Sequence, residues 1–456
     1  MPLFFAEDHP LTRKNPASSP TLAGTGEQLK SSSAVDGTVD SSFRARLQRH
    51  PVLTAFLFGA VALMIFLKGL SKPAIQFYDE GYYVQAAKSF LIDGPNTNPE
   101  APPLGKLLIA AAIKIAGDDS FGWRIAGSVC GALTLAAIFL WTFLISRNFQ
   151  TACIAAALTL LNNFLFVMSR VAMMDAFLVF FLLWTLVAFT AALELDLSTV
   201  SRRILMSVTG VLLGLAAACK WNAVDTLAVL LVVSLGSYWV PKRWVADDGS
   251  PAFKYVRNLR QIGIPSILLS FTVIPLIAYS LMFWPLCRSL HLPFGIHQLA
   301  SMNLFIWRFH VAVVVNKAIS SAWYTWPLKS SPQRGLSYLL GNPVIMWSGF
   351  AALLYSLRCV WKSPATAEGF VVLLYAANLL QWAVTPAPGT FYYYYYPAAL
   401  MLGVTIALAL RSLPSSIFGV RLSLIVLVAA AAVFLWCYPR MAYLESPWDC
   451  ALGCWE

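Results

Sequence analysis

Two adjacent carboxylates, Asp79 and Glu80, follow the first long apolar segment of the chain. Such a pair can supply a general base or hold a metal ion at the boundary between membrane and water. Further ionisable side chains lie beside other apolar segments, and these are Lys106, Arg124, Arg170, Asp175 and Lys220. Arginine holds a phosphate through its planar guanidinium, and lysine holds it as a point charge. A carboxylate base beside such cations predicts group transfer from a lipid-linked sugar phosphate to an acceptor hydroxyl.

The same residues also have a structural explanation. Asp79 and Glu80 could simply begin a solvated loop, and the cations could anchor apolar helices at the membrane interface. Ionisable groups within or beside a membrane are costly, however, and all of these are predicted to face one compartment. We therefore expect the set to form a single site.

The composition indicates a membrane protein with many crossings. Of the 456 residues, 59% are hydrophobic and 12% are charged, whereas soluble domains carry about 25% charged residues. This excludes a soluble enzyme, a secreted disulfide scaffold and a disordered regulator. The net charge of +11 does not indicate nucleic-acid binding, because the basic residues lie mostly between apolar segments, where they orient a membrane protein.

The hydropathy pattern predicts an all-α fold with about eleven transmembrane helices. The predicted spans are 52–70, 124–145, 151–168, 172–193, 204–219, 222–240, 262–284, 342–357, 366–384, 391–410 and 422–438. A polar segment, 1–50, is expected to be a disordered tail, because it has no apolar run of the signal-peptide kind. The membrane domain is then 51–440, and 441–456 forms a short tail.

The cations predict the orientation. Arg44, Arg46 and Arg49 precede the first span and should hold the N-terminal tail in the cytoplasm, and an odd number of spans then places the C-terminus outside. Every loop assigned to the cytoplasm carries Lys or Arg. Two long loops, 71–123 and 285–341, fall outside. Their short apolar pieces, Leu104–Ala116 and Phe294–Val315, are expected to lie along the membrane surface.

Several motifs, in order along the chain, resemble those of the protein O-mannosyltransferases. The first are Tyr78-Asp79-Glu80 and Ala101-Pro102-Pro103-Leu104-Gly105-Lys106. The later ones are Gly122-Trp123-Arg124, Ser169-Arg170 with Met174-Asp175, Cys219-Lys220-Trp221, the segment Trp323 to Leu328, Gly341-Asn342-Pro343, and Gly389-Thr390-Phe391 with the tyrosine run that follows. The resemblance covers about 77–400, which is most of the chain.

The resemblance implies a GT-C glycosyltransferase fold and an extracytoplasmic active site. It also implies a dolichyl- or polyprenyl-phosphate sugar as donor, with inversion at the anomeric carbon. Asp79 would be the catalytic base, and Glu80 would position acceptor or donor. Arg124 would contact the donor phosphate or support the carboxylates, with Lys106 nearby. The loop 285–341 has no room for the large soluble insert of eukaryotic members, which favours a bacterial type in the inner (plasma) membrane.

The remaining cleft residues are assigned on the same basis. Arg170, Asp175 and Lys220 are expected near the donor phosphate, while Tyr82, Trp323, Trp326 and Tyr393 are expected around the sugar or the acceptor. The tyrosine run 392–396 is otherwise typical of an aromatic belt at the membrane interface. His291, His297 and His310 have no metal-ligand spacing, so no metal ligand is assigned, although a divalent cation stays possible beside the carboxylates.

Three departures leave the substrate open. Ala101, Lys317 and Pro388 stand where members of the family tend to have His, His and Arg. The partners expected are therefore a polyprenyl-phosphate sugar, with mannose first, and an acceptor that is a protein Ser/Thr. A lipid or glycan acceptor, as in aminoarabinose transferases, is the alternative. A transporter is the alternative from another class, but it should carry charges near mid-bilayer and show repeats, and neither is found in the sequence.

Overall fold

The computed structural model of the chain describes residues 46–240, 251–312, 320–330, 339–362, 366–385, 390–413 and 418–442. Within these ranges the secondary structure is helical and no strand occurs. The predicted all-α fold is thus confirmed. The predicted tails, 1–50 and 441–456, lie almost entirely outside the described residues and stay predictions.

The first half of the chain forms nine of the described helices. They are α2 (Pro51–Leu67), α3 (Glu80–Leu91), α4 (Leu104–Ala116), α5 (Ser120–Ser146), α6 (Phe149–Leu160), α7 (Asn163–Met168), α8 (Met174–Glu194), α9 (Thr199–Cys219) and α10 (Ala223–Gly236).

The second half continues with α12 (Pro251–Ile262), α13 (Ile264–Leu268), the π-helix η1 (Leu269–Val273), α14 (Ile274–Leu281), α15 (Trp284–Ser289) and α16 (Ile296–Ala312). The 3₁₀ helix η2 (Trp323–Leu328) precedes α17 (Pro343–Lys362) and α18 (Ala367–Val384). The chain then forms the 3₁₀ helix η3 (Tyr392–Tyr395), α19 (Tyr396–Ser412) and α20 (Phe418–Met441).

Eight helical segments are long and apolar enough to cross a membrane, judged by length and composition. They are Ser120–Ser146, Met174–Glu194, Thr199–Cys219, Ile264–Ser289, Pro343–Trp361, Ala367–Val384, Tyr392–Ser412 and Arg421–Met441. Three shorter apolar helices, α2, α6 and α10, occupy the remaining predicted spans. Every predicted span is therefore helical, while the count of eleven crossings stays a prediction.

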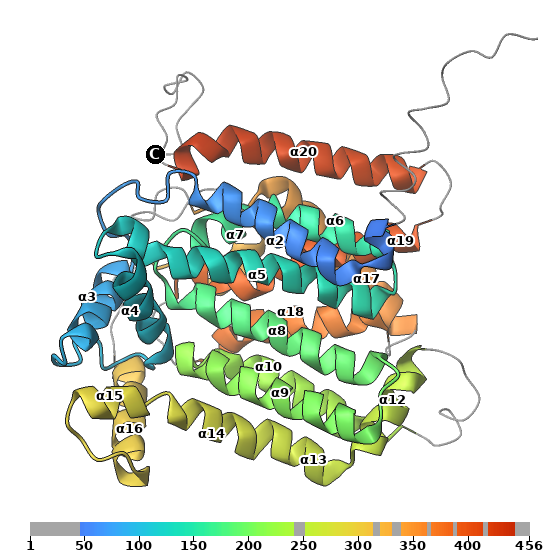
Figure 1. Ribbon diagram of the computed structural model, residues 1–456. Helices are drawn as coiled ribbons and strands as arrows, with labels where there is room; N and C mark the ends of the chain where they lie inside the picture. Colours follow the sequence, from blue (N-terminus) through green and yellow to red (C-terminus); the bar gives the residue numbers. More distant parts are fainter. Residues whose placement is uncertain are drawn as a thin grey trace, which may run out of the picture. The chain divides into compact units, whose positions relative to one another are not determined.

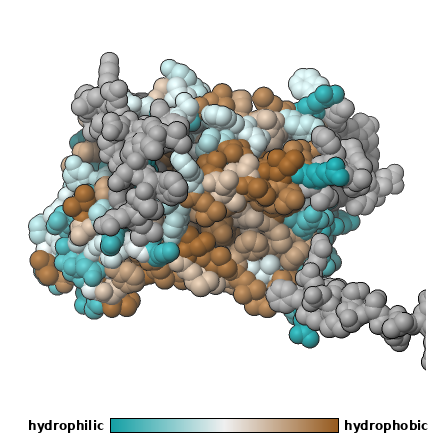
Figure 2. All heavy atoms as spheres, turned by 90° about the horizontal axis from the view of Figure 1, so that it is seen from above, coloured by the Kyte–Doolittle hydropathy of each residue, from teal (hydrophilic) through white to brown (hydrophobic). Residues whose placement is uncertain are grey.

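The long helices lie side by side, and the short helices of both predicted outer loops gather at one end of the bundle (Figure 1). At that end, α16 runs across the ends of the spans at a steep angle, as expected of a helix at the membrane surface. The face of the molecule in Figure 2 has an apolar band between two polar ends. This is the surface expected of a protein that crosses a membrane.

Close helix packing fixes the end of α9, where Lys220 follows. Gly210 and Gly214 are one turn apart, and a Cβ on them would come within 2.2 Å of the Ser270 oxygen and 2.4 Å of the Pro275 oxygen. Only glycine lets α9 approach η1 and α14 so closely, a pairing of small residues that is common between membrane helices. Lys220 leaves α9 in an extended conformation.

Candidate active site

Asp79 lies at the start of α3, at the end where the outer-loop helices gather. Its Oδ2 accepts hydrogen bonds from the hydroxyl of Tyr393 at 2.9 Å and from that of Tyr83 at 3.4 Å. Tyr83 belongs to α3 itself, whereas Tyr393 comes from η3, more than 300 residues away in sequence. Two phenols from different parts of the fold thus orient one carboxylate.

An ion pair lies beside this carboxylate. The Lys220 ammonium is 2.8 Å from Oδ1 of Asp175, at the first turn of α8. The same ammonium lies 4.2 Å from the ring centroid of Tyr394 and 5.4 Å from that of Tyr393. Because Tyr393 also bonds to Asp79, the two predicted elements of the site, base and cation, share one wall of tyrosines.

The surroundings of Asp79 change its proton affinity. Burial raises the pKa of the Asp79 carboxyl, and the negative charge of Asp175 adds to this effect. The hydrogen bond from Tyr393 and the charge of Lys220 oppose it, but the net pKa is above the ordinary value of 3.8. A raised pKa makes a carboxylate a stronger base near neutral pH.

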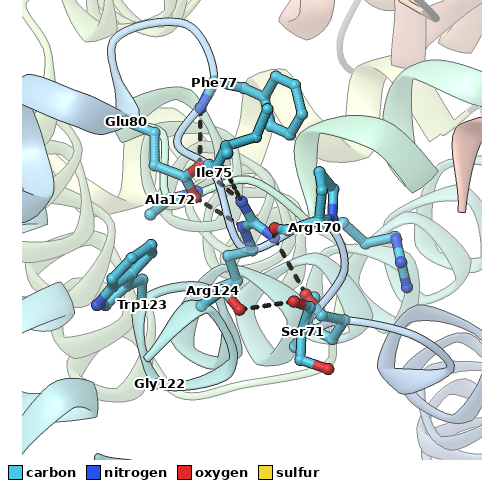
Figure 3. Close-up of polar contacts among 12 residues, drawn as sticks. Ser71, Ile75, Phe77, Glu80, Gly122, Trp123, Arg124, Arg170 and Ala172 are labelled. Carbon is cyan, nitrogen blue, oxygen red and sulfur yellow. Dashed lines mark hydrogen bonds and ion pairs between the residues drawn. The ribbon is translucent and has the colours of Figure 1, made fainter. Parts of the chain in front are cut away.

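Glu80 is enclosed and occupied on both oxygens, as Figure 3 shows. It accepts from Nε and Nη2 of Arg124 at 2.8 and 2.9 Å, and from the backbone N–H groups of Phe77 and Ala172 at 3.0 Å each. The side chain is fully buried. Four hydrogen bonds satisfy the carboxylate, which makes Glu80 a fixed support for the neighbouring Asp79.

Arg124 uses its remaining donors on the segment that leads to Asp79. Its Nη1 donates to the carbonyl oxygens of Leu70 and Pro73 at 3.3 and 2.9 Å, and Nη2 donates to that of Ile75 at 2.8 Å. All three guanidinium nitrogens are therefore engaged within the protein. Of the two roles implied for Arg124, support of the carboxylates fits this geometry better than contact with a phosphate.

The side chains of Arg170 and Lys106 also donate hydrogen bonds to backbone carbonyl groups. Arg170 donates to the carbonyls at the end of α2, which are those of Phe66, Lys68 and Gly69. The Lys106 ammonium donates to the carbonyl oxygens of Asn98 and Ala101, and burial lowers the pKa of this lysine to about 7. These two cations shape the loops around Asp79.

Of the two predicted tyrosines, Tyr393 bonds to Asp79, but on α3 it is Tyr83 and not the predicted Tyr82 that bonds to it. Tyr82 is 63% exposed, while Tyr83 is buried and bonds to the carboxylate. The helical spacing could have shown this, because residues four apart lie on one helix face. Burial raises the pKa of Tyr83 well above its usual value, so the phenol stays protonated and can donate.

The structure does not support the interpretation of the tyrosine run 392–396 as an aromatic belt. Belt residues lie at the lipid interface, but Tyr392, Tyr393, Tyr395 and Tyr396 are at most 3% exposed. Their rings pack into the core, for example Tyr392 against Phe164 at 4.9 Å. Tyr393 and Tyr394 of this run contact the charged groups described above.

The predicted tryptophans lie in η2, in different surroundings. Trp326 is fully buried and donates to the Ser321 hydroxyl at 2.9 Å, so it belongs to the core. Trp323 is half-buried and packs edge-on against Tyr324. Three residues depart from the motifs of the family. The backbone carbonyl of Ala101 accepts a hydrogen bond from the Lys106 ammonium, and Lys317 and Pro388 lie outside the described residues.

Within the described ranges, no three His, Cys, Asp or Glu side chains lie close enough together to hold a metal ion. His310 of α16 instead forms a hydrogen bond with the Glu100 carbonyl at 3.1 Å. A requirement for a divalent cation therefore stays a prediction from the sequence.

Known proteins resemble this chain in sequence. The family model "Dolichyl-phosphate-mannose-protein mannosyltransferase" matches residues 114–291. A polyprenol-phosphate-mannose–protein mannosyltransferase of Mycobacterium tuberculosis is 24% identical over 86% of this chain and 88% of its own. The enzyme of that name from Corynebacterium glutamicum is 25% identical over 74% of this chain and 77% of its own.

Solved structures resemble it in fold. The Saccharomyces cerevisiae protein O-mannosyltransferase complex Pmt1-Pmt2, bound to the sugar donor, aligns with a TM-score of 0.71 at 13% identity, over 87% of this chain and 90% of that one. ArnT of Cupriavidus metallidurans, bound to undecaprenyl phosphate, aligns at 0.59 and 17% identity, over 86% and 66%. Both agree with the predicted GT-C fold. In sequence and in fold, the chain thus resembles the protein O-mannosyltransferases.

Proposed function

We propose that this protein transfers mannose from a polyprenyl-phosphate donor to a Ser or Thr hydroxyl of a protein. The reaction takes place at the extracytoplasmic face of the bacterial plasma membrane. The observation that carries the proposal is the placement of the Asp79 carboxylate beside the Lys220 ammonium, on one wall of tyrosines at the end of the bundle where both outer loops gather.

The chemistry is a single displacement. Asp79 takes the proton of the acceptor hydroxyl as its oxygen bonds to the anomeric carbon. The bond from that carbon to the phosphate oxygen breaks on the opposite face, and polyprenyl phosphate leaves with the electron pair. Lys220 stabilises the charge that develops on the phosphate, as preorganised cations do in other transferases. The anomeric configuration is inverted.

The lipid chain of the donor has a fitting surface next to Lys220. A groove of about 330 Å³ opens between α9, α10 and α14. Apolar side chains dominate its lining, which includes Leu213, Ala217, Trp221 and Leu276. Trp221 directly follows Lys220 in the chain, so an isoprenoid chain in the groove would bring its phosphate to the ammonium.

Filling this groove with a larger side chain should weaken the binding of donors with a long lipid chain only. We expect Ala217→Trp to raise KM for a polyprenyl donor about tenfold, which corresponds to about 1.4 kcal/mol of lost binding. The KM for a donor with a chain of two isoprene units should change little. Ala351→Trp, at an exposed alanine of α17, is the matched control. An equal rise for both donors would place the lipid chain elsewhere.

The pKa of Asp79 predicts the pH dependence. A general base works only when it is ionised, so transfer should fall as the pH decreases through the pKa of Asp79, at a pH above that of an ordinary aspartate. Tyr393→Phe removes a hydrogen bond that lowers this pKa and should move the acid limb of kcat/KM to higher pH. Asp175→Asn removes a charge that raises it and should move the limb to lower pH. Shifts in the same direction would exclude Asp79 as the titrating group.

The choice of acceptor separates the main proposal from its alternative. Because the fold also resembles that of ArnT, a lipid or glycan acceptor is the alternative. Purified full-length protein in detergent is supplied with polyprenyl-phosphate [³H]mannose, together with a Ser/Thr-rich peptide, its all-Ala version or a lipid extract. We expect label only on the Ser/Thr peptide. Label in the lipid fraction instead would select the alternative acceptor.

A further inference from the structure

A group of polar side chains lies between α10 and α18, although both helices are otherwise largely apolar. Asn222, just before α10, donates from Nδ2 to Oε1 of Gln381 on α18 at 2.8 Å. The Gln381 side chain also interacts with the Asp225 carboxylate on α10. We call Asn222, Asp225, Gln381 and Trp382 the α10–α18 patch.

Two polar atoms of the patch have no hydrogen-bond partner among the described residues. They are Oδ2 of Asp225, an acceptor, and Nε1 of Trp382, a donor, and both are buried. Unsatisfied buried polar atoms cost stability, and an acid in an apolar membrane helix costs more. Apolar residues would join α10 and α18 more cheaply, so packing alone does not explain this patch.

The patch adjoins the proposed phosphate site through Tyr394. The indole of Trp382 stacks on the Tyr394 ring with centroids 4.5 Å apart and planes 13° apart. The Lys220 ammonium lies 4.2 Å from the same ring centroid. Asn222 stands two residues after Lys220 in the turn between α9 and α10. Lys220 and Trp382 thus contact the same tyrosine ring.

We infer that the α10–α18 patch binds hydroxyl groups of the hexose that the donor carries. This inference rests on the proposed function, because the hexose is joined to the phosphate through a single oxygen. A hydroxyl both donates and accepts, so vicinal hydroxyls can satisfy Asp225 Oδ2 and Trp382 Nε1 together. A phosphate would be repelled by Asp225, and a hydrocarbon chain would satisfy neither atom. The patch thus selects the sugar, while Asp79 and Lys220 act on the bond that breaks.

Binding of two ligands that differ only in the sugar tests the inference. Full-length wild type, Asp225→Asn and Trp382→Phe are compared for polyprenyl-phosphate mannose and for unsubstituted polyprenyl phosphate. Trp382→Phe removes the N–H but keeps an aromatic ring against Tyr394. We expect Asp225→Asn to lower the affinity for the mannose-bearing donor about tenfold or more. Trp382→Phe should lower the same affinity about threefold to tenfold. Neither should change the affinity for the bare lipid phosphate.

Asp118→Asn serves as the matched carboxylate-to-amide control, because Asp118 pairs with Lys88 on the surface of the outer loop. An equal loss for both ligands, or no loss for either, would overturn the assignment of the patch to the sugar. If Asp225→Asn does not fold, Trp382→Phe alone decides by the same criterion. Failure of the proposed function would appear in the wild type, as no transfer from the mannose donor, whereas failure of this inference appears only in the variants.

Discussion

Asp79→Asn is expected to abolish sugar transfer while the protein keeps its fold and its affinity for the donor. The amide has nearly the size of the carboxylate and can still accept from Tyr393 and Tyr83, so the hydrogen bonds that hold this position are kept. It cannot take the proton of the acceptor hydroxyl. General base catalysis contributes about 10²- to 10⁴-fold, so the rate of the chemical step should fall by that factor.

Single-turnover transfer with donor bound in advance measures this step directly. Donor affinity and the thermal midpoint in detergent are measured on the same preparations, with Asp118→Asn as the matched exchange at the surface. A folded Asp79→Asn protein that keeps most of its transfer rate would contradict the role of Asp79 as base.

The second large effect is expected when the ion pair between Glu80 and Arg124 is broken. It should appear first as a loss of folding stability. Arg124→Ala leaves the buried Glu80 carboxylate without its cation and leaves three carbonyl oxygens of residues 70–75 without their donor. Removing one partner of a buried ion pair costs about 3–5 kcal/mol. Transfer should be lost as well, because these contacts hold the segment that ends at Asp79.

Removing both charges distinguishes a support from a ligand-binding group. The double variant Glu80→Gln with Arg124→Met should be less destabilised than the sum of its single variants, because neither buried charge is then left alone. Thermal unfolding of the four proteins in detergent gives this coupling. Arg124→Ala with an unchanged thermal midpoint and a weakened donor affinity would instead place Arg124 at the phosphate.

The sequence predicts the helical segments well, because hydropathy and length alone determine them. The apolar piece Leu104–Ala116 coincides with α4, and each predicted span lies on one helix or on consecutive helical segments. Pairings between distant residues are harder to predict. Glu80 and Arg124 are 44 positions apart, and nothing in their spacing says that they meet. The packing of the segment after α2 against α5 brings them together.

Local patterns account for the other differences. A run of five tyrosines at a span entrance resembles an interfacial belt, and only tertiary packing shows that most of its rings are buried. Tyr83, in contrast, could have been found from its helical spacing to Asp79. Asp225 also carried a usable signal, since an acid within an apolar helix calls for a function. No recognised motif includes it.

The anomeric configuration of the product tests the central claim most directly. Wild-type protein in detergent converts polyprenyl-phosphate mannose and a Ser/Thr peptide, and NMR of the mannosyl peptide gives the configuration relative to that of the donor. A single displacement with Asp79 as base predicts complete inversion. Retention would contradict both the single displacement and the role of Asp79 in it.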